Sequence, residues 1–122
     1  MTAVPEPQPL VVYDGPGVGT ELWGMTSASF SFPEPSGRRR EVSVQVNDAA
    51  MEYLAKQLGR ENSDEFRGEA VRTLGEAMLR RLLASRAHIP PEVTVSRWVL
   101  AQQPELVEAL RPLAAPPAPV AA

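Results

Sequence analysis

The chain has 122 residues, of which 43% are hydrophobic, and a formal net charge of −3, so it has the size of one folded domain with its own core. It contains no cysteine and a single histidine, which excludes thiol catalysis, disulfides and cysteine-ligated metal sites. The acidic balance argues against diffuse binding to nucleic acid or anionic membranes, and we predict no cofactor and no metal site.

Prolines gather at both ends of the chain and bound the expected folded part. We expect a flexible Pro-rich segment over residues 1–9, a single α+β domain over residues 10–113 and a disordered Ala/Pro-rich tail over residues 114–122. The first segment holds no apolar run long enough for a signal-peptide core or a membrane span. We therefore expect a cytoplasmic protein without a membrane partner.

Two short strands are predicted near the N-terminus, at residues 10–13 and 20–23, around a glycine-rich turn at residues 14–19. A phosphate-binding P-loop needs a Gly-Lys-Ser/Thr sequence that opens a helix. Neither the lysine nor the helix pattern follows here, so we interpret this loop as a plain turn.

Strict alternation of apolar and serine-rich polar positions predicts an antiparallel β-hairpin over residues 28–47. A proline- and glycine-containing stretch at residues 33–37 supplies its turn. The side chains expected to point into the core are Phe30, Phe32, Val44 and Val46.

Helical periodicity follows in two stretches. Asn47 and Asp48 are both placed to cap a first helix that Gly59 ends. Asn62 and Glu65 form a capping-box pattern for a second, long helix that continues to about residue 87.

After Pro90–Pro91, residues 93–96 alternate as a strand, and Pro104 opens a short last helix at its first helical position. The order of the elements predicts an α+β fold. Its sheet is mainly antiparallel, built from the N-terminal strands, the hairpin and the later strand, with two or three helices packed on one face.

Residues 28–32, 41–55 and 92–95, with the long helix between the last two, resemble a known family of small bacterial α+β proteins, domain of unknown function 1488. The resemblance extends from Ala28 to about Arg97. It implies a fold and no activity, because the family has no assigned reaction.

No catalytic residue is predicted. His88 has no nucleophile or orienting carboxylate near it in sequence, and we interpret it as a helix-end residue. Helix capping and the helix dipole explain the carboxylates that begin the long helix, which are Glu61, Asp64, Glu65 and Glu69. The scattered aromatic residues Tyr13, Trp23, Tyr53 and Trp98 are interpreted as core or dimer-interface residues.

Arg38, Arg39 and Arg40 place three permanent charges at the base of the hairpin. They fit either a solvated sheet edge or a contact with an anion or acidic partner. The second interpretation supports an alternative function, because the stretch from Arg40 onward also resembles a ribbon-helix-helix DNA-binding transcriptional regulator, with Ser43 and Gln45 directed at base edges. The predicted strand at residues 28–32 would occupy the edge through which such ribbons pair, which opposes this alternative.

The sequence favours a small non-catalytic binding or protein-interaction module. A ribbon-helix-helix regulator is the alternative, and a small enzyme is the third hypothesis. We also expect a homodimer, since the apolar surface of the hairpin and long helix exceeds what one core covers. Its interface is expected at a sheet edge or along the long helix at Val71, Leu79 and Leu83.

Overall fold

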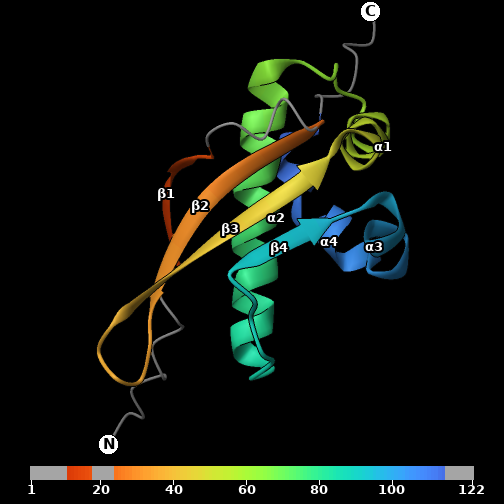
Figure 1. The fold of residues 1–122 in the computed structure, drawn as a ribbon. Helices are drawn as coiled ribbons and strands as arrows, with labels where there is room; N and C mark the ends of the chain where they lie inside the picture. Colours follow the sequence, from red (N-terminus) through yellow and green to blue (C-terminus); the bar gives the residue numbers. More distant parts are fainter. Residues whose placement is uncertain (1–10, 18–23, 115–122) are drawn as a thin grey trace, which may run out of the picture.

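A four-stranded sheet with helices on one of its faces makes up the protein (Figure 1). The computed structural model describes residues 11–17 and 24–114, so the expected segment 1–9 and all but the first residue of the expected tail lie outside the described residues. The strands are β1 (Val12–Pro16), β2 (Met25–Pro33), β3 (Arg39–Asn47) and β4 (Glu92–Val95), in that order across the sheet. The helices are α1 (Asp48–Leu58), α2 (Asp64–Ala84), α3 (Arg97–Gln102), α4 (Pro104–Ala109) and the 3-10 helix η2 (Arg111–Leu113). This is the predicted α+β fold.

The β2–β3 hairpin forms the centre of the sheet. Its strands pair antiparallel, with Phe30 opposite Val42. Phe30, Val44 and Val46 are fully buried and Phe32 is 3% exposed. The predicted hairpin and its four inward side chains are therefore confirmed.

Strand β4 joins the sheet parallel to β3, with Val95 beside Val46. The chain reaches it after α1 and α2, which form the crossover that a parallel pair requires. The other two pairings, β1 with β2 and β2 with β3, are antiparallel. The sheet is thus mixed and mainly antiparallel, as predicted.

The first strand runs further than predicted. We expected a strand to end at Tyr13, but β1 continues through Pro16. The register against β2 shifts between Tyr13 and Gly15, and Gly15 takes a φ of 128° that favours glycine. This bulge lets the strand continue where the sequence indicates a turn. The second expected strand, residues 20–23, lies outside the described residues.

Side-chain caps set the beginnings of both long helices. Of the two predicted caps of α1, Asn47 has the role, because it accepts a hydrogen bond from the Ala50 N–H, and Asp48 is the first helical residue. Gly59 ends the helix with a φ of 65°, as predicted. The predicted capping box of α2 is wrong, because Ser63 is the cap and accepts from the Phe66 N–H at 3.1 Å.

Helix α2 is shorter at its C-terminal end than the sequence predicts. It ends at Ala84, and Arg86 follows with a φ of 56°, which leaves the right-handed helical region. His88 therefore lies beyond the helix, exposed in the segment that leads to β4. The interpretation of His88 as a helix-end residue is corrected accordingly.

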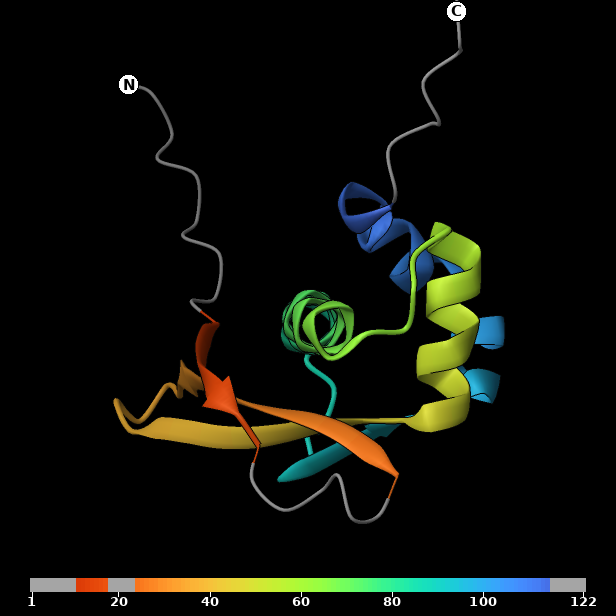
Figure 2. The same ribbon diagram turned by 90° about the horizontal axis from the view of Figure 1, so that it is seen from above.

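Within residues 11–17 and 24–114 four α-helices, not two or three, lie on the same side of the sheet (Figure 2). Helix α2 crosses the middle of the sheet, and α4 packs against it. Helices α1 and α3 lie side by side at one end of the sheet. The sequence did not reveal α3, because six residues do not complete two helical turns and give no readable periodicity.

Candidate functional site

Trp98 is the only large apolar side chain exposed among residues 11–17 and 24–114, with 70% of its surface open to solvent. It lies on α3, which begins at Ser96, whose hydroxyl accepts a hydrogen bond from the Val99 N–H. Leu100 anchors the same helix in the core, fully buried. The indole is therefore held outward by a fixed element. Trp98 is therefore not a core residue, and its predicted role at an interface stays a prediction.

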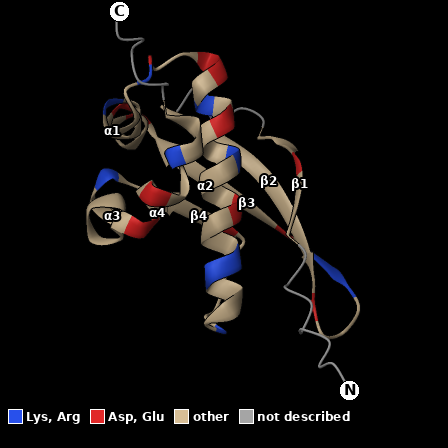
Figure 3. Ribbon diagram, turned by 180° about the vertical axis from the view of Figure 1, so that it is seen from behind, with Lys and Arg blue, Asp and Glu red and all other residues tan. Residues whose placement is uncertain are grey.

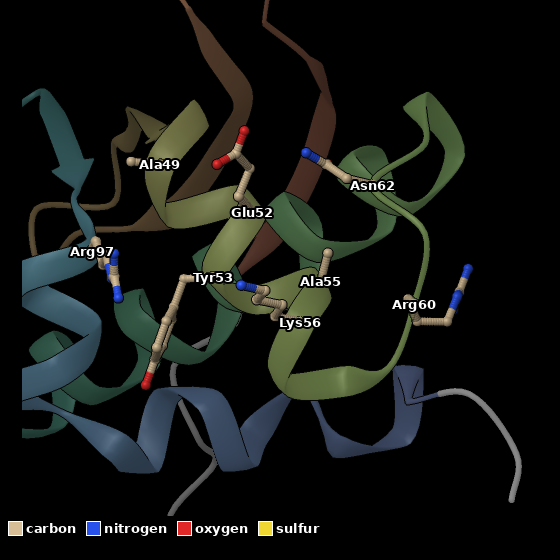
Figure 4. A pocket seen from close by; sticks show the side chains of 8 residues that line it. All are labelled: Ala49, Glu52, Tyr53, Ala55, Lys56, Arg60, Asn62 and Arg97. Atoms are coloured by element: carbon tan, nitrogen blue, oxygen red, sulfur yellow. The ribbon is translucent and has the colours of Figure 1, made fainter.

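A hollow of about 380 Å³ opens between α1, the loop that follows it and α3 (Figure 4). We call it the α1–α3 hollow, and its volume lies in the range of small-molecule and side-chain pockets. Inside it the guanidinium of Arg97 lies over the ring of Tyr53, 5.6 Å from the ring centre. The residues that line it are Ala49, Glu52, Tyr53, Ala55, Lys56, Arg60, Asn62 and Arg97.

The charged groups of the hollow differ in how far they are already paired. Arg60 donates to the Leu113 carbonyl at 2.7 Å and lies 3.7 Å from a Glu69 carboxylate oxygen. Figure 4 shows its side chain directed away from the other lining residues. Glu52 and Lys56 are exposed and make no ion pair within the described part of the chain. These two groups, with Arg97, remain open to a partner.

Asn62 contributes an unsatisfied polar atom at the edge of the hollow. Its Oδ1 is buried and has no hydrogen-bond partner among the described residues. The sequence predicted a capping role for Asn62, and Ser63 has that role instead. The orphaned amide could not be predicted from the sequence, because both residues are common helix caps and only the backbone geometry selects one of them.

The three arginines of the hairpin do not form one free patch. Arg39 donates to the Ser31 hydroxyl at 2.7 Å. Arg40 donates to the Ile89 carbonyl and lies 4.0 Å from a Glu34 carboxylate oxygen. Arg38 alone is exposed without such a contact in the described part of the chain. Figure 3 shows this basic stretch on the hairpin, at the end of the sheet away from α1 and α3.

The side chains proposed for DNA reading, Ser43 and Gln45, are partly buried on the face of β3 opposite the helices. Strand β3 is paired with β2 on one edge and with β4 on the other. A ribbon-helix-helix dimer pairs this strand between two chains. No edge of β3 is free for that pairing, so the structure does not favour the alternative.

The predicted dimer interface on the long helix is corrected in part. Val71 is 2% exposed and Leu79 is fully buried, so neither offers contact surface to a second chain. The reason is that α2 packs against β2 and also against α4, which covers its wide apolar stripe from a second side. Leu83 is only partly buried and packs against the core.

The remaining candidates for chemistry do not converge on one site. Glu69 lies near Arg60, and Asp64 pairs with Arg67. No group of three or more carboxylates and histidines placed to hold a metal occurs within residues 11–17 and 24–114. Gly15 and Pro16 of the glycine-rich loop belong to β1, and residues 18–20 lie outside the described residues.

None of the helices in the described part of the chain has both the length and the apolar character that crossing a membrane requires. Comparison with protein-family models, with curated proteins and with solved structures finds no match to this chain.

Proposed function

We propose that the protein is a non-catalytic protein-interaction module that binds through the face formed by the α1–α3 hollow and Trp98. We call this surface the α1–α3 face. The exposed indole of Trp98 is the observation that carries the proposal. Tryptophan, tyrosine and arginine dominate the binding energy of protein interfaces, and this face presents one of each in Trp98, Tyr53 and Arg97.

The exposed indole of Trp98 presents apolar surface to water that a partner could cover with a gain in free energy. A tryptophan side chain buries about 150–250 Å² when it is covered, at about 25 cal/mol per Å². Covering the exposed part of Trp98 therefore gains about 3 kcal/mol before the cost of association. A partner with an apolar contact point would recover this energy.

The chemistry of the side chains supports a non-catalytic function. The chain has no thiol, and its one histidine, His88, is exposed beyond the end of α2.

The proposed location is the cytoplasm. A chain without cysteine is compatible with a reducing compartment. We keep a homodimer as its proposed state. The resemblance to domain of unknown function 1488 stays a prediction and contributes no reaction.

Photo-crosslinking tests the proposed function in cells. A benzophenone amino acid at position 98 should give light-dependent adducts with protein, identified by mass spectrometry as a second copy or another chain. The same amino acid at Ser36, exposed in the hairpin turn, serves as the control. We expect several-fold more adduct from position 98. Equal yields at the two positions would show that Trp98 does not mark a binding surface.

A further inference from the structure

An exposed indole and a hollow of suitable size adjoin each other at α3, because Arg97 lines the hollow and Trp98 is the next residue of that helix. We infer that two copies of the chain pair about a two-fold axis, with Trp98 of each protomer seated in the α1–α3 hollow of its partner. An axis close to α3 therefore brings each indole toward the other hollow. This inference rests on the proposed function and names its partner.

The chemistry of the hollow suits an indole. Ala49, Ala55 and Tyr53 provide apolar and aromatic contact surface, and the volume of about 380 Å³ accommodates one aromatic side chain. Lys56 and Arg97 lie on its wall. Cations are attracted to the face of an indole more strongly than to other aromatic rings. The hollow thus offers an entering tryptophan both packing and cation–π contacts.

Charge complementarity favours a second copy as the occupant. A two-fold interface places each residue against a different residue of the same surface, so the surface must complement itself. The α1–α3 face carries Glu52 together with Lys56 and Arg97, all exposed and none engaged in an ion pair within the described residues. Glu52 of one protomer can therefore pair with Arg97 of the other. A surface of one sign would repel its own copy.

The two sheet edges and the long helix are less suited to a dimer interface. Strand β4 has four residues and follows directly on Pro91, and β1 carries a register shift at Gly15 and ends at Pro16. Short strands, bulges and prolines are the features that prevent sheet edges from pairing with other chains. Val71 and Leu79 lie in the core. Leu83 is only partly buried, but it is a single side chain that packs against the core, so the α1–α3 face with its exposed indole is the better candidate.

Sedimentation velocity over micromolar to submillimolar concentrations tests the pairing directly. The wild-type chain should shift from 13.2 kDa to twice that mass as its concentration rises. Trp98→Ala should weaken the dimer about 30-fold or more, as loss of an interface tryptophan does. Ser36→Ala, at an exposed position in the hairpin turn, is the control and should leave dimerisation unchanged. Circular dichroism verifies that both variants are folded.

Mixing two charge variants separates pairing between chains from effects within one chain. Glu52→Lys and Arg97→Glu each place like charges opposite each other in their own homodimer, so each should remain monomeric. Mixed in equal amounts they should form a heterodimer, because Lys at position 52 then faces Glu at position 97 and the second contact keeps its native pair. A structural role of either residue inside one protomer would not produce rescue in the mixture.

The possible outcomes distinguish this inference from the proposed function. A wild-type chain that stays monomeric, a Trp98→Ala variant that dimerises as tightly as wild type, or a charge mixture that stays monomeric overturns the reciprocal pairing. If position 98 then crosslinks to a different protein, the α1–α3 face is still a binding surface and its partner is another chain. If it crosslinks to nothing, both proposals fail.

Discussion

Gly75 of α2 lies directly against the ring of Phe30 in β2. A Cβ atom built at Gly75 would come within 2.5 Å of Phe30 Cε2 and 2.6 Å of Cζ. Real side chains do not approach this closely, so the absence of a side chain at position 75 is what lets the helix settle onto the sheet. Because Phe30 is fully buried, its ring has no free space into which to turn.

Replacement of Gly75 by alanine should therefore destabilise the fold. Overpacking a core costs about 1–3 kcal/mol, and the better helix propensity of alanine returns only about 1 kcal/mol. We expect the upper part of that cost, because the nearest atoms belong to a rigid ring, and hence a net loss of about 2 kcal/mol in urea unfolding. Phe30→Leu in the same chain should recover part of this loss by removing the clashing ring atoms.

Gly68 provides the matched control on the same helix. A Cβ atom at this position meets nothing within 4 Å, so alanine should raise the free energy of unfolding by up to about 1 kcal/mol. If Gly75→Ala proves as stable as Gly68→Ala, the close approach of α2 to the sheet is wrong.

The difference between these two glycines shows where sequence reasoning ends. Alternation at Phe30 and Phe32 predicted the hairpin and its buried face, because strand periodicity is a local property of the chain. Nothing local distinguishes Gly75 from Gly68. That difference depends on a contact with a ring 45 positions earlier in the chain, counting from 75 back to 30, which only the packing of helix on sheet creates.

The candidate site shows the same limit. The apolar character of Leu79 and Trp98 is evident from the sequence, but the sequence led us to place Leu79 at an interface and left Trp98 among core or interface residues. In the structure Leu79 is fully buried and cannot form an interface, whereas Trp98 is 70% exposed and can. The cause is the position of the short helices, since α4 covers α2 and α3 turns Trp98 outward. Pro104 predicted α4 but not where it packs, and the six residues of α3 show no period from which that helix could be predicted.

The cap of α2 gives a second stability prediction. Ser63→Ala removes the acceptor for the Phe66 N–H and should cost about 1 kcal/mol in thermal or urea unfolding. Asn62→Ala removes a buried oxygen that has no partner among the described residues, so stability should stay the same or rise. If Asn62→Ala lowers the free energy of unfolding more than Ser63→Ala does, then Asn62 and not Ser63 caps α2.

Glu105 links α4 to α2 and should make stability depend on pH. A backbone hydrogen bond at Glu105 and a second hydrogen bond from Arg81 lower the pKa of this carboxyl below its ordinary value of 4.5. The charged form is therefore favoured in the folded state, and its stabilising effect is present above pH 4.5 and is lost as the pH falls through the lowered pKa.

The variant Glu105→Gln isolates this effect. Its deficit relative to wild type, measured as the free energy of unfolding, should be present at neutral pH and should shrink as the pH is lowered below 4.5. Glu61→Gln, at an exposed carboxylate without an ion pair in the described residues, controls for the loss of one negative charge. A deficit for Glu105→Gln that stays constant from neutral to acidic pH would contradict the assignment.

Arg40 has a structural role that its neighbour Arg38 lacks. The guanidinium of Arg40 donates to the Ile89 carbonyl and lies over the ring of Phe32, 6.0 Å from its centre, so it ties the hairpin to the segment that leads into β4. A hydrogen bond from a charged donor contributes about 1.5–3 kcal/mol when its acceptor is partly buried. Arg40→Ala should lower the free energy of unfolding by about 1–2 kcal/mol, because the Ile89 carbonyl loses its charged donor. It should also speed hydrogen exchange at β4.

Arg38→Ala removes the same charge from an exposed side chain and should change stability by less than about 0.5 kcal/mol.

The Arg38→Ala variant also tests whether Arg38, Arg39 and Arg40 form an anion-binding contact. If Arg38 and Arg39 bound phosphate or an acidic partner, Arg38→Ala would reduce salt-dependent retention on heparin while leaving stability intact. We expect retention to be weak for wild type and unchanged for Arg38→Ala, since Arg39 is held by Ser31 and Arg40 by Ile89. Equal stability of the two variants would show that the Arg40 contact does not hold the hairpin.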